Sequence, residues 1–139
     1  MVAISVAYRG DLRCEAVHGP SGSRLETDAP ADNQGKAERF SPTDLVATAL
    51  ATCIATILGI LARRRGWDLR GMRLDIEKHM TAEGPRRIAH LPLTIHMPVA
   101  LPEEDRRAAE QSAQGCPVLR SLHPDIAVEI AFRWPDGER

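Results

Sequence analysis

One segment decides the fold of this chain: residues 40–66, which read FSPTDLVATALATCIATILGILARRRG. Ser41 suits the N-cap of a helix, and Pro42 suits its first position because proline has no amide hydrogen to leave unpaired there. Asp44 can return a bond to the Ser41 backbone, as in a capping box. Three arginines and a glycine close the segment and are typical of a helix end. The segment therefore predicts one helix from Pro42 to the arginines, over ~30 Å long at about 1.5 Å per residue.

The middle of this helix, residues 45–62, contains no charged residue and reaches the length of a membrane span. Its composition argues against one, because only eight of its side chains are both bulky and apolar. Small residues recur every fourth position and would let another helix pack closely: Ala47, Ala51, Ala55 and Gly59. A helix that is apolar on nearly all sides must be covered on all sides. We therefore expect a central helix in a homodimer, since one small domain can hardly enclose it.

Length, composition and charge exclude several classes of protein. The chain of 139 residues predicts one domain over residues 1–139, since a domain has about 100–200 residues. A hydrophobic content of 43% with a net charge of −1 excludes intrinsic disorder. The balance of 18 Lys and Arg against 19 Asp and Glu argues against a nucleic-acid binder, and the few aromatic residues offer no platform for stacked bases. We expect neither a nucleic-acid partner nor a membrane association.

The remaining pattern predicts strands on both sides of the long helix and a second helix near the C-terminus. Apolar and polar residues alternate with the period of a half-buried strand over six stretches: 2–8, 12–16, 24–27, 72–80, 91–97 and 126–134. Acidic residues after Pro102 open the second helix, and Gly115 ends it. Pro92 predicts an edge strand or a bulge, because proline cannot donate to a sheet. Segregated strands and helices in this order predict an α+β fold.

Three cysteines are too few and too far apart for a secreted disulfide framework. The N-terminal residues have neither a basic lead nor a long apolar run, so we expect no targeting segment and a cytoplasmic protein. Cys53 lies among apolar helix residues, where most free cysteines are small core residues. Cys14, in an alternating strand, is more typical of a structural residue. Local sequence therefore assigns no reactive role to either thiol.

Cys116 stands between a glycine that ends a helix and a proline that suits a new helical turn. A thiol at a helix N-terminus gains thiolate character, but a turn cysteine without function fits the same sequence. The five histidines form no cluster with metal-site spacing, and an acyl-transfer pair of Cys116 and His123 has no further support. Phosphate-binding, dinucleotide-binding and nucleophile-elbow motifs do not occur. We therefore expect no metal and no cofactor.

Two motifs occur together in this chain. Phe-Ser-Pro-Thr-Asp-Leu at residues 40–45 leads through the alanine-rich helix to Ala51-Thr52-Cys53, and Gly-Cys-Pro-Val at residues 115–118 follows the second helix. The pair resembles the OsmC/Ohr family, the osmotically induced protein C and organic hydroperoxide resistance proteins, and above all its OsmC-like branch. The resemblance extends from the N-terminal strands to Trp134. It implies the OsmC-like α+β fold: an antiparallel sheet and two long central helices in an intertwined dimer, with active sites at the subunit interface.

The resemblance also implies a chemistry. In that family the helix cysteine attacks the peroxide and the Cys-Pro cysteine resolves it, so Cys53 would be peroxidatic and Cys116 resolving. A thiolate attacks the O–O bond, becomes a sulfenic acid and condenses with a second thiol. The implied protein is a thiol peroxidase with peroxiredoxin-like chemistry that defends against oxidative stress, with an organic hydroperoxide or peroxide as substrate and a dithiol as reductant. The alternative is an OsmC-fold protein that senses redox state or binds small molecules without peroxidase turnover.

The sequence departs from the peroxidase members at two positions. Those members carry a glutamate directly after the helix-opening proline, where this chain has Thr43, with Asp44 one residue later. They also carry an arginine in the early turn, where this chain reads His-Gly-Pro-Ser-Gly at residues 18–22. In the family that arginine pairs with the glutamate and activates the thiolate. Three arginines could replace it in space: Arg13, Arg24 and Arg39.

Overall fold

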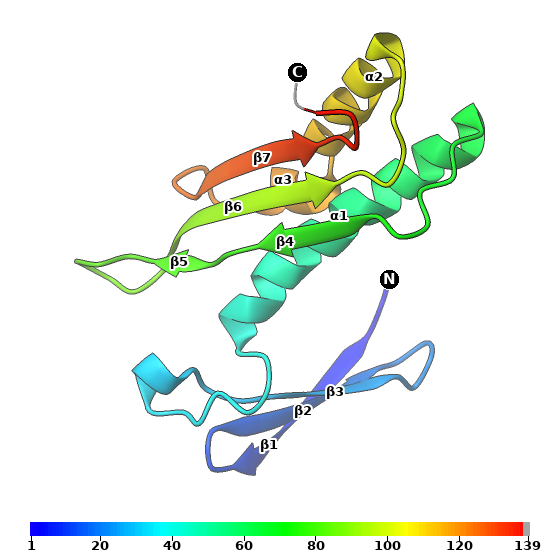
Figure 1. Cartoon of the computed structure of the whole chain (residues 1–139). Helices are drawn as coiled ribbons and strands as arrows, with labels where there is room; N and C mark the ends of the chain where they lie inside the picture. Colours follow the sequence, from blue (N-terminus) through cyan, green and yellow to red (C-terminus); the bar gives the residue numbers. More distant parts are fainter. Residues whose placement is uncertain (138–139) are drawn as a thin grey trace. The chain divides into compact units, whose positions relative to one another are not determined.

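The long helix predicted from the sequence is present as α1, Pro42–Arg65, in the computed structural model, which describes residues 1–137 (Figure 1). It begins with a capping box: the Asp44 amide donates to the Ser41 hydroxyl at 3.0 Å, and the Ser41 amide donates to the Asp44 carboxylate at 2.9 Å. At the other end Gly66 has a φ of 77°, and its amide donates to a carbonyl of the last turn. Both predicted ends of the helix are confirmed.

The described residues divide into two units, residues 1–46 and residues 47 onward. The first unit holds a three-stranded antiparallel sheet in chain order, as the alternating N-terminal sequence predicts. Its elements are β1 (Ile4–Gly10), β2 (Arg13–His18), β3 (Arg24–Thr27) and the 3₁₀ turn η1 (Ala31–Asn33). The prediction of a single domain over residues 1–139 stays a prediction.

Strand pairing gathers apolar side chains on one face of this sheet. Val6 pairs with Ala16, and Ala16 pairs with Leu25. Directly opposed residues point to the same face, and that face continues at Ile4 and Tyr8 because side chains alternate along a strand. The three β1 residues of this face are each more than 60% exposed. The face is therefore open to solvent in a single chain.

The second unit holds a mixed sheet centred on β6, Ile88–His96. Two strands pair with it antiparallel along one side, β4 (Arg73–Ile76) and β5 (His79–Met80). β7 (Ala127–Arg133) pairs with it parallel along the other side. The strands predicted over 72–80, 91–97 and 126–134 are thus all present.

The parallel pairing of β6 and β7 corrects the expectation of an antiparallel sheet. Between these strands the chain forms α2 (Glu103–Gln114) and the short α3 (Pro117–Ser121). This long connection carries the chain back to the starting end of β6, so β7 runs in the same direction as its neighbour. The other strand pairs in the described residues are antiparallel, as expected.

Pro92 lies in the central strand of this sheet, so the predicted edge position is wrong. It is opposite Glu129 of β7 on one side and opposite the break between β4 and β5 on the other. At that break the Pro92 carbonyl accepts the Glu77 amide at 3.1 Å. A proline is tolerated here because the N–H that it lacks would have pointed to the interrupted side of the ladder.

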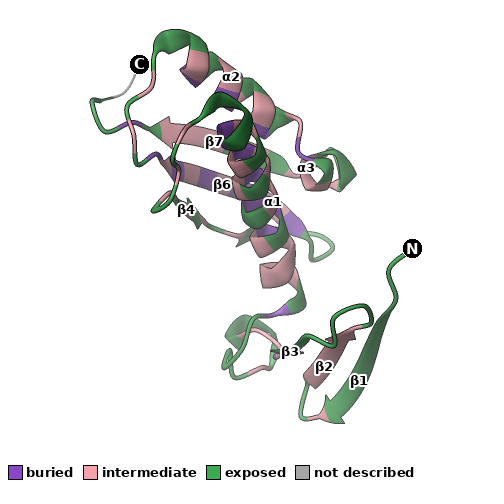
Figure 2. Ribbon diagram, turned by 90° about the vertical axis from the view of Figure 1, so that its right-hand side faces the viewer, coloured by how far each residue is buried: buried purple, intermediate pink, exposed green. Residues whose placement is uncertain are grey.

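All three helices lie on one face of the mixed sheet (Figures 1 and 2). Figure 2 shows the buried residues along α1 and β6. The core combines large side chains from α1 and β6 with alanines from α2: Leu50, Ile54, Leu58, Leu91, Leu93, Ile95, Ala109 and Ala113. The buried stripe of α1 fixes the direction in which its remaining side chains point.

One stripe of α1 is buried and the opposite side is not. Ala47 and Ala51 of the predicted small-residue stripe are buried, whereas Ala55 and Gly59 are half-buried. Ile60 is 47% exposed. By length and composition α1 could cross a membrane, a criterion that core helices of globular proteins also meet. A single chain does not enclose this helix, and the expected intertwined dimer stays a prediction.

Candidate active site

The fold brings the two thiols of the implied site together. Cys53 lies midway along α1 and is half-buried, and Cys116 is the N-cap residue of α3. The two side chains are close enough that Cys53 raises the pKa of the Cys116 thiol. No local signal in the sequence shows this proximity, because β4, β5, β6 and α2 lie between the two residues in chain order.

Cys116 is held in place by its own backbone surroundings. Its side chain is fully buried, and its sulfur accepts the Leu119 amide at 3.4 Å. Pro117 occupies the first position of α3, where its missing amide costs nothing. Burial raises the pKa of the Cys116 thiol above its ordinary value, and the neighbouring Cys53 side chain raises it further. Cys116 is therefore a protonated thiol at neutral pH.

An open cavity of about 470 Å³ lies beside Cys53. Cys53 is in its lining and Cys116 is not, so an incoming molecule meets Cys53 first. The other lining residues are small or apolar apart from two threonines, and come from α1 and the start of α3: Ala49, Thr52, Thr56, Ile57, Pro117 and Val118. A cavity of this character suits a ligand with an apolar body.

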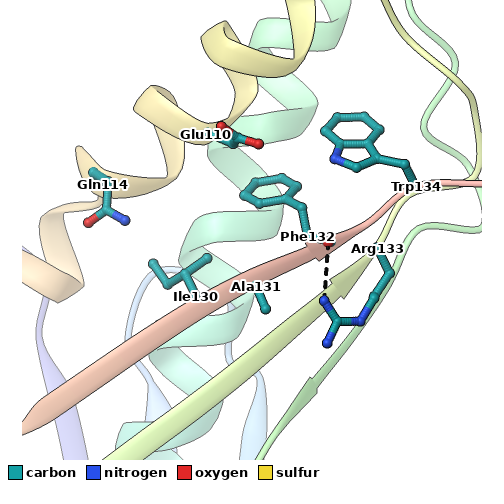
Figure 3. Close-up of a pocket in the computed structure, with 7 residues that line it drawn as sticks. All are labelled: Glu110, Gln114, Ile130, Ala131, Phe132, Arg133 and Trp134. Carbon is teal, nitrogen blue, oxygen red and sulfur yellow. Dashed lines mark hydrogen bonds between the residues drawn. The ribbon is translucent and has the colours of Figure 1, made fainter. Parts of the chain in front are cut away.

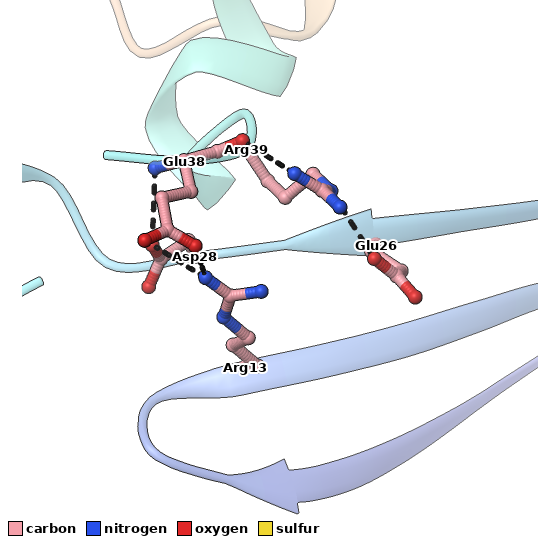
Figure 4. Close-up of polar contacts among 5 residues, drawn as sticks. All are labelled: Arg13, Glu26, Asp28, Glu38 and Arg39. Carbon is pink, nitrogen blue, oxygen red and sulfur yellow. Dashed lines mark hydrogen bonds and ion pairs between the residues drawn. The ribbon is translucent and has the colours of Figure 1, made fainter. Parts of the chain in front are cut away.

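The three arginines proposed to replace the missing family arginine all lie in the N-terminal unit and are paired with carboxylates, and Figure 4 shows two of them, Arg13 and Arg39. Arg24 contacts Glu15 at 2.7 Å, and Arg39 contacts Glu26 at 3.1 Å. Arg13 contacts Glu38 and, at 3.7 Å, Asp28.

Asp28 anchors the loop that carries Glu38 and Arg39. It is 1% exposed and accepts the Glu38 amide at 3.1 Å (Figure 4). That backbone hydrogen bond is the main reason why the pKa of Asp28 is held below its usual range, and the Arg13 charge lowers it further. No pattern in the sequence indicates a special role for Asp28. Asp44, the acidic residue one position after Thr43, caps the start of α1, where its carboxylate accepts the Ser41 amide.

The third cysteine, Cys14, belongs to the N-terminal unit, whereas Cys53 and Cys116 belong to the second unit. Cys14 lies in β2 of the N-terminal unit, opposite Tyr8 and Thr27, and is half-buried. Among residues 1–137, no group of three or more histidine, cysteine or acidic side chains is arranged to hold a metal ion. The thiol pair is the candidate site that the following proposal uses.

A second cavity, of about 450 Å³, lies between α2 and β7 (Figure 3). Glu110 and Gln114 line it from α2, and the stacked rings of Phe132 and Trp134 line it from β7 and the residue after it. Arg106 packs its guanidinium 4.8 Å from the centre of the Trp134 ring and pairs with Asp136 at 2.6 Å. These contacts hold Trp134 and Asp136, which follow β7, against α2. No thiol or histidine lines this cavity.

Comparison with known proteins gives a family match. A family model described as OsmC-like protein matches residues 35–131. No curated protein matches the chain. A solved structure from Psychrobacter arcticus 273-4, of a protein assigned to osmotic stress and the detoxification response, is 42% identical, covers 96% of both chains and has a TM-score of 0.90.

Two further solved structures carry the name organic hydroperoxide resistance protein. The one from Legionella pneumophila is 16% identical, with a TM-score of 0.71 and coverage of 95% of this chain and 96% of that one. The one from Elizabethkingia anophelis is 13% identical, with a TM-score of 0.69 and coverage of 95% and 94%. At these identities they show a shared fold alone. Together the likenesses confirm the expected α+β fold.

Proposed function

The chain belongs to the OsmC-like protein family, and on that premise we propose that it is a thiol peroxidase that reduces organic hydroperoxides or peroxide in defence against oxidative stress. One observation carries the proposal: the thiol that borders the cavity, Cys53, lies close enough to a second, fully buried thiol, Cys116, to raise its pKa. An oxidised thiol with a second thiol in contact has a direct route to a disulfide.

The first step belongs to Cys53. Its thiolate attacks the terminal oxygen of the hydroperoxide, so that an S–O bond forms while the O–O bond breaks. The remaining oxygen leaves as an alkoxide, which takes up a proton and departs as an alcohol. Cys53 is now a sulfenic acid, which excess peroxide can oxidise irreversibly unless a second thiol intervenes.

The second step belongs to Cys116. Once it has lost its proton, its sulfur attacks the Cys53 sulfur, an S–S bond forms, and the hydroxyl of the sulfenic acid leaves as water. An external dithiol then reduces this disulfide by exchange and restores both thiols. The two cysteines and the dithiol balance the reaction, so it requires neither a metal nor another cofactor.

The proposal also includes a homodimer in the cytoplasm. Support for the dimer comes from apolar surface that one chain leaves uncovered, at Ile4, Val6 and Tyr8 on β1 and at Ile60 on α1. Burial of such surface between two chains is favourable at roughly 25 cal/mol per Å². Support for the location comes from the chemistry, since free thiols and dithiol reductants are maintained in reducing compartments.

A thiol titration tests the proposed function. The Cys14→Ser variant has only the two thiols of the pair, so any loss belongs to them. One equivalent of tert-butyl hydroperoxide should remove both thiols per chain, and dithiothreitol should restore both. Repeated additions should give repeated turnover. If no thiol is lost, or if thiols are lost without repeated turnover, the protein is instead a binding or redox-sensing member of the family.

A further inference from the structure

The strand β7 has an open edge, and we infer that two copies of the chain associate by pairing β7 with itself, antiparallel, about a two-fold axis at Ala131. This pairing joins two mixed sheets into one. None of the β7 residues lines the cavity beside Cys53 or belongs to the exposed apolar surface that supports the proposed homodimer. The strand pair is therefore a second interface, and it does not depend on the proposed peroxidase chemistry.

The backbone of β7 can bond to another strand along its open edge. Among residues 1–137, β6 is the only strand that pairs with β7. The Met97 amide donates to the Arg133 carbonyl at 2.9 Å, so the backbone of Arg133 points to β6. Successive residues of a strand direct their amide and carbonyl groups to opposite sides. The amides and carbonyls of Ile130 and Phe132 therefore point to the open edge.

The α2 side of β7 offers apolar contacts to a second strand. Ile130 and Phe132 are half-buried and line the cavity of about 450 Å³ between α2 and β7, and Figure 3 shows both side chains on the α2 side of the strand. With Ala131 on the axis, Ile130 lies directly opposite the partner's Phe132. Each apolar side chain of this face then meets another one, as in a stable cross-strand pair.

The other face of β7 supplies complementary charges. Glu129, Ala131 and Arg133 alternate with the apolar residues and so share this face. With Ala131 on the axis, Glu129 lies directly opposite the partner's Arg133. Opposite charges in this position stabilise a strand pair, and like charges destabilise it. Both side chains are exposed, and Glu129 also contacts His90 at 3.4 Å.

The charges also select the register of the pair. Moving the axis by one residue in either direction places Arg133 opposite an alanine, so the ion pairs are lost. The Arg133 guanidinium already lies at the open edge, because it donates to the Phe132 carbonyl at 3.5 Å (Figure 3). The sequence of β7 is thus complementary to its own reverse only when Ala131 is at the centre.

A disulfide at the axis tests the pairing. Residue 131 would face its own copy in a non-hydrogen-bonded pair, with Cα atoms about 4.5 Å apart, which is within reach of a disulfide. Mild oxidation of Ala131→Cys should therefore link two chains, and mass spectrometry of the linked peptides should show a disulfide between the two introduced thiols. Ala127→Cys is the control on the same face, because its two copies would lie about 27 Å apart at ~3.4 Å per residue.

Charge reversal in the Ala131→Cys chain tests the register. Arg133→Glu places two carboxylates opposite each other, and Glu129→Arg places two guanidinium groups opposite each other. Each single reversal should slow cross-linking at position 131 by at least about fivefold. The double reversal, Glu129→Arg with Arg133→Glu, restores opposite charges and should return the rate to within about twofold of the starting chain.

Two results would overturn the pairing. One is cross-linking at position 131 that is no faster than at position 127. The other is a double reversal that cross-links as slowly as the single ones, since charge at this edge would then act without the predicted register. Neither result bears on peroxidase turnover, which is measured at Cys53 and Cys116.

Discussion

The thiol of Cys53 on α1 lies close enough to the thiol of Cys116, which caps α3 and is fully buried, to raise the pKa of Cys116. The two sulfurs differ in access, because only Cys53 borders the open cavity. Burial and the proximity of Cys53 also raise the pKa of the Cys116 thiol. In the proposed function this asymmetry assigns the two roles: Cys53 reacts with the oxidant, and Cys116 stays reduced beside it until the second step.

The Cys116→Ser variant should stop after the first step. Serine is a good helix N-cap, so α3 should keep its start. Without the second thiol, each chain should consume one equivalent of hydroperoxide and hold a sulfenic acid at Cys53, which dimedone labels. Turnover with a dithiol should fall by at least about tenfold, and excess peroxide should yield sulfinic acid.

The Cys53→Ser variant is the matched control for that experiment and should consume no hydroperoxide. Full turnover by Cys116→Ser would show that the buried thiol is not the resolving group. Peroxide consumption by Cys53→Ser would show that another residue attacks.

Disulfide formation should accelerate as the pH rises. Attack on the sulfenic acid requires the Cys116 thiolate, and the raised pKa of this thiol makes that form scarce at neutral pH. While the pH stays below that pKa, its fraction grows about tenfold per pH unit. Stopped-flow measurement of the decay of the Cys53 sulfenic acid should give a rate that is still rising at pH 9. A rate that levels off between pH 6 and 7 would contradict the protonated state of Cys116.

Asp28→Asn should destabilise the loop of the N-terminal unit at neutral pH. Because the folded pKa of Asp28 is depressed, its contribution is fully present above its unfolded pKa of about 3.9. The contribution is lost as the pH falls through the lower folded pKa. Thermal unfolding should show a lower Tm for the variant at pH 7 and convergence with wild type in acid. Asp11→Asn, in the exposed β1–β2 turn, is the control and should show no such convergence.

Sedimentation should find a homodimer at micromolar concentration. Ile60→Glu should weaken it by at least about tenfold, because a carboxylate buried against apolar surface is strongly unfavourable. Arg64→Glu, near the same end of α1 and exposed, changes charge without removing apolar surface and should have a smaller effect. A monomeric wild-type protein would contradict the dimer, and an unchanged dimer in Ile60→Glu would place the interface elsewhere.

Local sequence was sufficient to predict α1 and the strands, because helix capping and the alternation of apolar and polar residues depend on near neighbours in the chain. Ser41 and Asp44 make the bonds that their spacing predicts. Alternation could not give the direction of β7 relative to β6, since it encodes which face is buried and not which strand is opposite. The break beside Pro92 belongs to neighbouring strands, so the proline alone could not reveal it.

The site was predictable only through family resemblance. Nothing local to Cys53 distinguishes it from a core cysteine, and its contact with Cys116 exists only once α1 and α3 are packed on one sheet. The contact of the buried Asp28 depends on backbone positions and side-chain rotamers. Such a feature has no periodicity or spacing in the sequence.

The central claim is that Cys53 is oxidised first and then joined to Cys116, and mass spectrometry of the wild-type protein tests it most directly. Samples quenched with iodoacetamide during treatment with substoichiometric cumene hydroperoxide report the state of each thiol over time. We predict that sulfenic acid appears at Cys53 alone, that a Cys53–Cys116 disulfide replaces it, and that Cys14 stays reduced. Oxidation of Cys116 while Cys53 remains reduced, or no oxidation of either thiol in excess hydroperoxide at alkaline pH, would contradict the account.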